Sequence, residues 1–235
     1  MSAYVCLPCN RRRHMVRGVT LVDMLIGLAI GLFIVSQGLI MLAAHLHENK
    51  RLVIESRLMQ DLRTAAAMID RDLRRAGHWR DATAALWRED TPTRANPYQV
   101  ISMTSGVSDT VRLHYSRDVN ENHAVDGNEA FGFRLRNHAI DALLGGSWQT
   151  LTDATTVRVT SLRLTPLAAE VDQPMACDKP CPPAAAGAAA CPPRILVRQF
   201  ELAIDAESPI DPAIRRSLQA TTRVRNDAAI GACPP

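Results

Sequence analysis

The chain has 235 residues, of which 27 are Lys or Arg and 24 are Asp or Glu, so its formal net charge is +3. Four arginines lie within the first 18 residues, and without them the remaining chain carries 3 − 4 = −1. Because this remainder is close to neutral, its bulk charge gives no argument for nucleic-acid binding. The length allows one globular domain beside a membrane segment.

An uncharged apolar run follows the basic N-terminal segment. Residues 24–44 contain no charged side chain, and a helix of that length, at about 1.5 Å per residue, crosses the roughly 30 Å hydrocarbon core of a bilayer. A secretory signal would have its small-residue cleavage site after the run, whereas Gly18 lies before it. We therefore expect a retained membrane helix. The basic residues Arg11, Arg12, Arg13 and Arg17 place the N-terminus in the cytoplasm and the C-terminal domain across the membrane.

The start of the run resembles the N-terminal signature of type IV prepilins and type II secretion pseudopilins. In these families a basic leader ends in Gly, and an acidic residue stands at the fifth position after it; here these are Gly18 and Asp23. The resemblance implies that prepilin peptidase cuts between Gly18 and Val19 and methylates the new amine of Val19. It also implies that Asp23, in place of the usual Glu, forms an assembly salt bridge with the terminal amine of a neighbouring subunit.

The helix is expected to continue beyond the membrane. Apolar residues recur at three- and four-residue steps with charged residues between them, which is typical of an amphipathic helix packed on a domain: Ile54, Leu58, Leu62, Ala65, Ile69, Leu73 and Ala76. Gly77 is the expected stop. The stretch from Met68 to Trp79 resembles the helix end of PilW-like minor pilins and J-type pseudopilins.

Short alternating segments rich in β-branched and aromatic residues predict strands after the helix, at 98–104, 110–116, 131–137, 157–165 and 194–204. The segment from Ile214 to Asp227 resembles the last strand of PilW-type proteins. The expected fold class is α+β and pilin-like, with an antiparallel sheet laid against the long helix. We expect four parts: a leader (1–18), a transmembrane half-helix (19–45), an amphipathic half-helix (46–77) and a β-rich head (78–235).

Six cysteines are present, of which Cys6 and Cys9 lie in the expected leader. The four others form an even set in a compartment that favours oxidation, so two disulfides are expected, with one bridge tying the C-terminal tail to the domain. A four-thiolate zinc site is the alternative. Sequence cannot choose among the three connectivities of Cys177, Cys181, Cys191 and Cys233.

One loop has the spacing of a calcium-binding loop. Oxygen-bearing side chains occupy its first, third, fifth, ninth and twelfth places: Asp118, Asn120, Asn122, Asp126 and Glu129. His123 occupies the sixth place, where Gly usually makes the turn. The pattern therefore allows either a Ca²⁺ site or a polar hairpin loop without an ion. No nucleophile motif or paired catalytic carboxylates are recognisable, so an enzyme is not expected.

The resemblance implies a minor pilin of the PilW type that primes or joins a type IV pilus near its tip. Its partners would be prepilin peptidase, other minor and major pilins through the N-terminal helix, and the assembly platform in the inner membrane. It would be a single-pass inner-membrane protein with a periplasmic head, and would then reach the cell surface. A minor pseudopilin of a type II secretion system is the alternative, and a membrane-anchored sensor or enzyme with an uncleaved helix is a third possibility.

Overall fold

The computed structural model of the protein describes residues 18–85, 94–103, 109–181 and 191–233. The expected leader lies outside these residues, apart from Gly18. The chain forms two compact units, Met1–Lys50 and Arg51–Pro235, and we call the second unit the head. One long helix, α1 (Leu21–Arg75), contributes its first part to one unit and its second part to the head.

The second part of α1 packs through the apolar stripe expected from the sequence. Leu58, Leu62, Ile69 and Leu73 are almost completely buried. Burying each such side chain stabilises the fold by about 1.5–3 kcal/mol, so this face fixes the helix against the head. The helix ends where Gly77 adopts φ +74°, a left-handed conformation that glycine adopts without a Cβ penalty.

Among the described residues of the head, the strands form two antiparallel sheets. The first has the order β1-β2-β3-β4-β5, with β1 (Ser102–Met103), β2 (Thr110–His114), β3 (Ala130–Arg136), β4 (Ala139–Leu144) and β5 (Ser147–Thr150). The second has the order β6-β7-β8, and β9 also pairs with β7. Its strands are β6 (Arg158–Asp172), β7 (Arg194–Glu207), β8 (Arg215–Arg223) and β9 (Ala228–Ile230).

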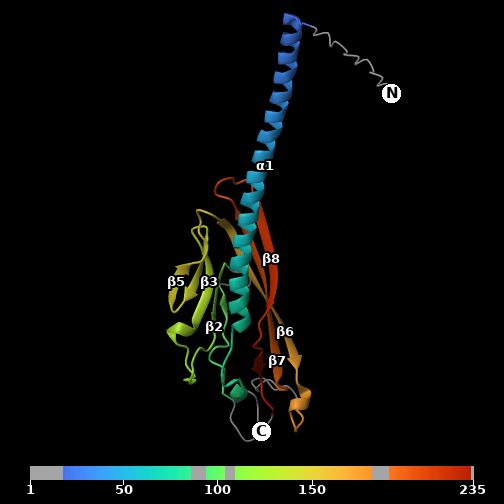
Figure 1. The fold of residues 1–235 in the computed structure, drawn as a ribbon. Coiled ribbons are helices and arrows are strands. Elements are labelled where there is room, and N and C mark those ends of the chain that lie inside the picture. Colours follow the sequence, from blue (N-terminus) through green and yellow to red (C-terminus); the bar gives the residue numbers. More distant parts are fainter. Residues whose placement is uncertain (1–17, 86–93, 104–108, 182–190, 234–235) are drawn as a thin grey trace, which may run out of the picture. The chain divides into compact units, whose positions relative to one another are not determined.

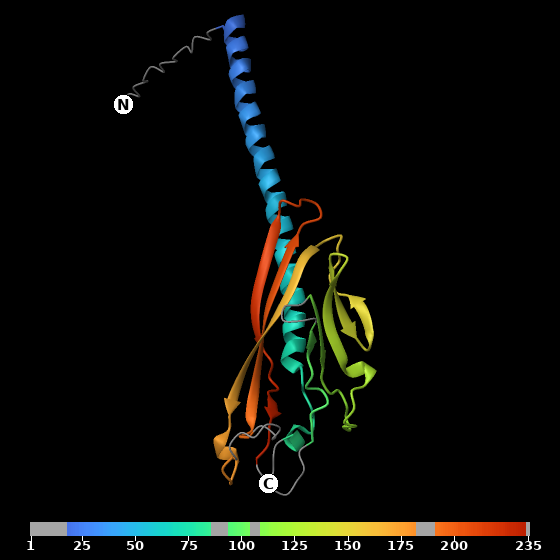
Figure 2. The same cartoon turned by 180° about the vertical axis from the view of Figure 1, so that it is seen from behind.

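The hydrophobic core lies where the second part of α1 meets both sheets. Figure 1 shows this part of α1 with β2, β3 and β5 on one side and β6, β7 and β8 on the other, and the reverse view agrees (Figure 2). The core cluster joins Leu62 and Ile69 of α1 to Phe133 of β3 and to Leu164 and Leu202 of the second sheet. The expected α+β pilin-like fold, a long helix on antiparallel sheets, is confirmed.

Several strand predictions differ from the structure. Neither β4 nor β5 was predicted from the sequence. In β4 the cause is burial along almost its whole length, so that apolar and polar residues do not alternate. Of the strand expected at 98–104, only β1 is formed within the described residues, and Tyr98 lies in a turn instead. Residues 104–108 lie outside the described part of the chain.

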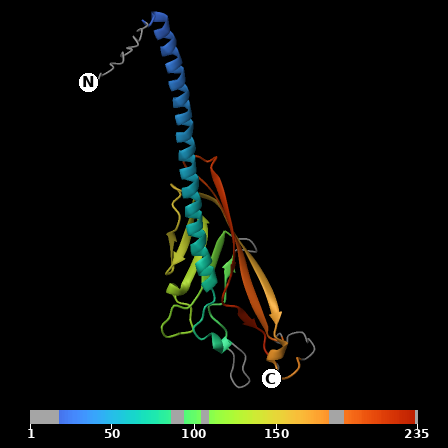
Figure 3. The same cartoon turned by 45° about the vertical axis from the view of Figure 1, so that its right-hand side comes forward.

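The second sheet is longer than expected because β6 and β7 stay paired beyond the core. Their register runs from Arg158 opposite Glu207 to Asp172 opposite Arg194. The hairpin extends past the end of α1, towards the short 3-10 turn η3 (Pro174–Ala176) (Figure 3). The outer part of β6 is exposed and its apolar residues do not alternate with polar ones, so the sequence pattern predicted a strand only as far as residue 165.

Candidate functional site

The start of α1 is closed by a reciprocal cap between Thr20 and Asp23. The Thr20 hydroxyl and backbone N–H both donate to one Asp23 carboxylate oxygen, at 2.7 and 3.1 Å. The Asp23 N–H donates back to the Thr20 hydroxyl at 3.2 Å. Such a capping box satisfies backbone donors that the first turn of a helix leaves free. Asp23 therefore helps to cap the N-terminus of its own helix. Asp23 is also exposed, and it lies a few residues after Gly18 and Val19.

The first part of α1 exposes its apolar side chains all round. Its most apolar window has a mean hydropathy of 2.3, and none of that window is buried within the protein. Length and composition alone make it a candidate membrane span, a test that a signal sequence also passes. A fully exposed apolar helix needs an apolar environment, and here the helix continues directly into the folded head. The segment thus indicates membrane anchoring.

The structure gathers three of the five candidate calcium ligands. Carboxylate oxygens of Asp118, Asp126 and Glu129 lie within 4.8 Å of one another. The Asn122 side chain donates to Asp126 at 2.8 Å and accepts from the Ala124 N–H. Asn120 is exposed.

Hydrogen bonds to Glu129 can hold the loop in its conformation without an ion. Its carboxylate is fully buried and accepts the backbone N–H groups of Arg117 at 2.8 Å and Asp126 at 3.0 Å. It thereby caps the 3-10 turn η2 (Gly127–Glu129), with Asp126 as the N-cap residue. Hydrogen bonds to a buried carboxylate are strong because the local dielectric is low. The calcium interpretation stays a prediction beside this structural role.

His123 adopts the backbone conformation for which the sixth position normally needs glycine. Its φ is +62°, which costs a non-glycine residue about 1–2 kcal/mol. The imidazole packs edge-on against Trp79, with ring centroids 5.8 Å apart, and its Nε2 lies 3.5 Å from Asp81. These contacts tie the loop to the segment after α1.

A second polar network lies beneath the same loop. Tyr98 is buried, and its hydroxyl donates to Glu121 at 2.9 Å, while Ser116 donates to the other Glu121 oxygen at 2.8 Å. Burial, together with the negative Glu121, raises the pKa of Tyr98. Burial opposes ionisation of Glu121, but the hydrogen bonds from Ser116 and Tyr98 outweigh it and lower the pKa of that carboxyl group. Tyr98 thus anchors the loop by a polar contact.

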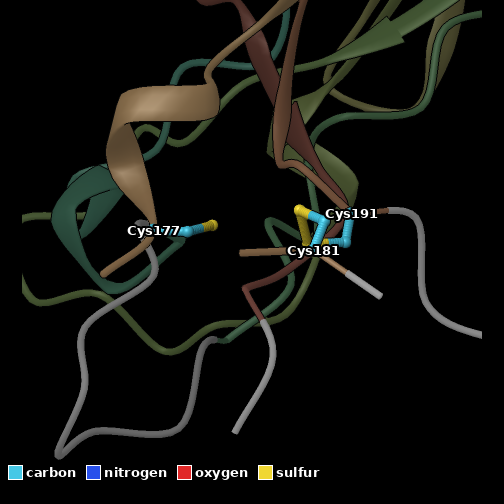
Figure 4. Close-up of side chains that lie close together, drawn as sticks. All are labelled: Cys177, Cys181 and Cys191. Atoms are coloured by element: carbon cyan, nitrogen blue, oxygen red, sulfur yellow. A yellow bond between two sulfur atoms is a disulfide. The ribbon is translucent and has the colours of Figure 1, made fainter. Parts of the chain in front are cut away.

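Two disulfide bonds are formed among the residues that the structure describes. Cys177 is joined to Cys233, and Cys181 to Cys191, with Cα–Cα distances of 5.4 and 5.6 Å. Figure 4 shows the Cys181–Cys191 bond beside Cys177. All four sulfurs expected to pair do so, which leaves none of them as a thiolate for zinc, and Cys233 ties the C-terminal segment back to η3 as expected.

A cluster at the end of α1 was missed by sequence reasoning. The Asn226 side chain donates to the carbonyls of Arg75 and Ala76, at 3.2 and 3.1 Å. Arg198 of β7 donates to the Asn226 carbonyl at 3.0 Å and to the Gln99 carbonyl at 2.5 Å, and burial lowers its pKa. The helix C-terminus is therefore capped by residues more than 120 positions away in sequence, a relation that no local pattern contains.

A family model described as prepilin peptidase-dependent protein B (PpdB) matches residues 51–224, about three quarters of the chain. The chain belongs to this family. The PpdB match begins after the apolar run, so it rests on the head and is independent of the Gly18 to Asp23 signature. Together they establish a pilin-related protein that depends on prepilin peptidase and therefore interacts with that enzyme.

The comparisons with curated proteins and with solved structures found no match.

Proposed function

We propose that this PpdB-family chain is a minor pilin of the PilW type, cut between Gly18 and Val19, N-methylated at Val19, and built into or priming a type IV pilus. The observation that carries this proposal is the exposed apolar start of α1, whose capped first turn follows Gly18 directly. A helix without partners in its own chain is suited to bundling with the same helix of other subunits. In this role the protein spans the inner membrane once, places its head in the periplasm and has no catalytic activity.

Processing tests the first step. Replacing Gly18 with Leu should block the cut and leave full-length precursor in the membrane, because the peptidase site accepts a small residue there. Gly38→Leu is a matched control, since a Cβ at either glycine meets no atom within 4 Å. Intact-mass analysis should give a methylated chain that begins at Val19 for the wild type and the control. A Gly18→Leu protein that is still cut at Val19 would refute the assigned site.

The proposed assembly role of Asp23 can be separated from its capping role. Asp23→Asn keeps an oxygen that can accept from Thr20 but removes the charge, whereas Asp23→Glu keeps the charge. If Asp23 pairs with the amine of a neighbouring subunit, the Asp23→Asn protein should insert into the membrane normally but fail to enter the fibre. An unpaired carboxylate in the membrane is costly, so its pairing in the fibre favours assembly, and the Asn variant lacks this contribution. Recovery of Asp23→Asn in sheared fibres at the wild-type level would contradict the pairing.

The competing role is a minor pseudopilin of a type II secretion system, which would use the same helix. Deleting the gene and measuring surface pili and secreted enzymes in the same cells separates the two roles. We expect loss of pili with normal secretion. Normal piliation with lost secretion would replace the pilus proposal with the secretion one.

A further inference from the structure

A concentration of arginines surrounds a hollow at the end of α1. Five of them line it together with His78, and Asp72 is the one carboxylate among the described lining residues; the arginines are Arg71, Arg74, Arg75, Arg117 and Arg225. We call this hollow the arginine pocket. Its volume of about 650 Å³ lies within the roughly 300–1,000 Å³ typical of ligand sites, and is larger than a single small ion needs.

This charge does not reflect a basic head. Five of the 27 Lys and Arg and two of the 24 Asp and Glu precede residue 51, so the head has 22 of each and is formally neutral. Five arginines around one hollow are therefore a local departure from a balanced surface. They come from three separate segments: the last turns of α1, the segment after β2, and the segment after β8.

Only part of this charge is neutralised within the protein. Arg71 lies 3.0 Å from Asp72, and Arg74 lies 2.8 Å from Asp70. Among the described residues, no ion pair is formed by Arg75, Arg117 or Arg225, and all three are exposed. Like charges held around one hollow repel each other, so an incoming anion would be stabilised there.

The pocket wall also includes apolar residues. Tyr115 and Phe131 stack with ring centroids 3.9 Å apart and are themselves buried, whereas Leu144 in the same wall is only partly buried. Guanidinium groups bind carboxylates through paired hydrogen bonds, and the partly exposed Leu144 suits an apolar side chain beside them. A ligand that satisfies both surfaces carries carboxylates next to an apolar group.

We propose that the arginine pocket binds an acidic segment of a partner protein, with its Asp or Glu side chains on Arg75, Arg117 and Arg225 and a neighbouring apolar side chain against Leu144. Nucleic acid fits less well, because its phosphate chain would extend beyond the pocket over a head that is formally neutral, whereas a short acidic segment can end within the pocket. The inference names the chemistry of a partner and so rests on the assembly role proposed above.

Fluorescence anisotropy can test the pocket on the full chain, purified in an uncharged detergent. The probe is a labelled peptide, Glu-Glu-Phe-Glu-Glu, and its matched control is Gln-Gln-Phe-Gln-Gln. The pocket variant is Arg117→Gln with Arg225→Gln. The control variant, Arg57→Gln with Arg63→Gln, removes the same charge from exposed arginines of α1 that do not line this pocket.

We expect the wild type and the control variant to bind the Glu peptide and not the Gln peptide. The pocket variant should bind it at least about tenfold more weakly, since each charged hydrogen bond contributes roughly 1.5 kcal/mol or more. All variants should melt at the wild-type temperature, because the substituted side chains are exposed. Equal binding by the pocket and control variants would overturn the proposal.

Competition identifies the ligand class. A short DNA duplex that displaces the peptide from the wild type at lower concentration than unlabelled peptide would replace the proposal with a nucleic-acid site. Displacement by millimolar inorganic phosphate as effective as by the peptide would reduce the pocket to a general anion site and refute the peptide assignment. Because no fibre is present, peptide binding can fail while pilus assembly is intact, and it can succeed in a protein that is never assembled.

Discussion

Replacing Gly77, which lies at the end of α1, should destabilise the head for two reasons that can be measured separately. Its φ of +74° penalises any Cβ by about 1–2 kcal/mol. A Cβ there would also lie 3.0 Å from Nη2 of Arg198. This guanidinium cannot move freely, because it donates to the carbonyls of Asn226 and Gln99. Losing one such bond costs roughly 1.5–3 kcal/mol, so Gly77→Ala should cost about 2.5–5 kcal/mol.

Gly145 provides a matched control in the turn between β4 and β5. Its φ is +59°, but a Cβ there meets no atom within 4 Å. Gly145→Ala should therefore cost only the backbone penalty of about 1–2 kcal/mol. For a unit of this size, each kcal/mol lowers the melting temperature by about 2–4 °C. The difference between the two variants measures the displacement of Arg198.

Thermal melting of the full chain followed by near-ultraviolet circular dichroism is the assay. Arg198→Met completes a double-mutant cycle, because without the guanidinium the cost of Gly77→Ala should fall to that of Gly145→Ala. Equal losses for Gly77→Ala and Gly145→Ala in the wild-type background would show that Arg198 yields freely, and the reasoning about a fixed cap would fail.

Three further measurements address the loop and the tail. Glu129→Ala should lower the free energy of unfolding by roughly 3 kcal/mol or more, and with it the melting temperature, because two backbone N–H groups lose a charged acceptor. The calcium hypothesis adds that millimolar Ca²⁺ but not Mg²⁺ raises the melting temperature of the wild type alone, and identical melting with chelator contradicts it. The pKa of Glu121 is lowered from its ordinary 4.5, so its stabilising effect is complete above that pH and is lost as pH falls through the folded-state pKa; melting from pH 6 to 2 should show a smaller decline for Glu121→Gln. Cys233→Ser removes a disulfide whose cysteines are 56 residues apart, and Cys191→Ser removes one whose cysteines are 10 apart. The loop entropy of the unfolded chain therefore predicts losses of unfolding free energy of about 4 and 2.7 kcal/mol, respectively. Equal losses in melts without reductant would exclude this entropic explanation.

Sequence was sufficient for α1 because each of its halves carries its own signal, an uncharged apolar run in the first and a periodic apolar stripe in the second. The uncharged run specifies the first part, and Leu58, Leu62, Ile69 and Leu73 specify the buried face of the second. It was not sufficient for β4, where Asp141 is buried beside Arg134 at 3.0 Å. A paired carboxylate at a buried position breaks the apolar pattern on which strand prediction depends.

The candidate sites divide in the same way. From the sequence, Asp23 was expected only to form the assembly salt bridge, and its cap with Thr20 was not predicted, although the two residues are three apart and a local rule would have been enough. The arginine pocket could not be predicted, because the sequence around Arg71, Arg74 and Arg75 has the form of an ordinary solvated helix face. The pocket also requires Arg117 and Arg225, and only the folding of two separate sheets brings these residues to the same hollow.

The head is stabilised by its own core, whereas the first part of α1 is exposed and apolar. Loss of assembly in a variant can therefore be assigned to one of the two units. The head has its own core, disulfides and helix cap, so its melting reports substitutions at Gly77, Glu129 or Cys233. The first part of α1 buries nothing within the protein, so a substitution at Asp23 cannot act through the head core. A variant that loses assembly while the head melts normally therefore marks a contact with another subunit, and one that loses both marks a folding defect. Applied to Arg117 and Arg225, the same comparison separates a docking site from a structural charge cluster inside living cells.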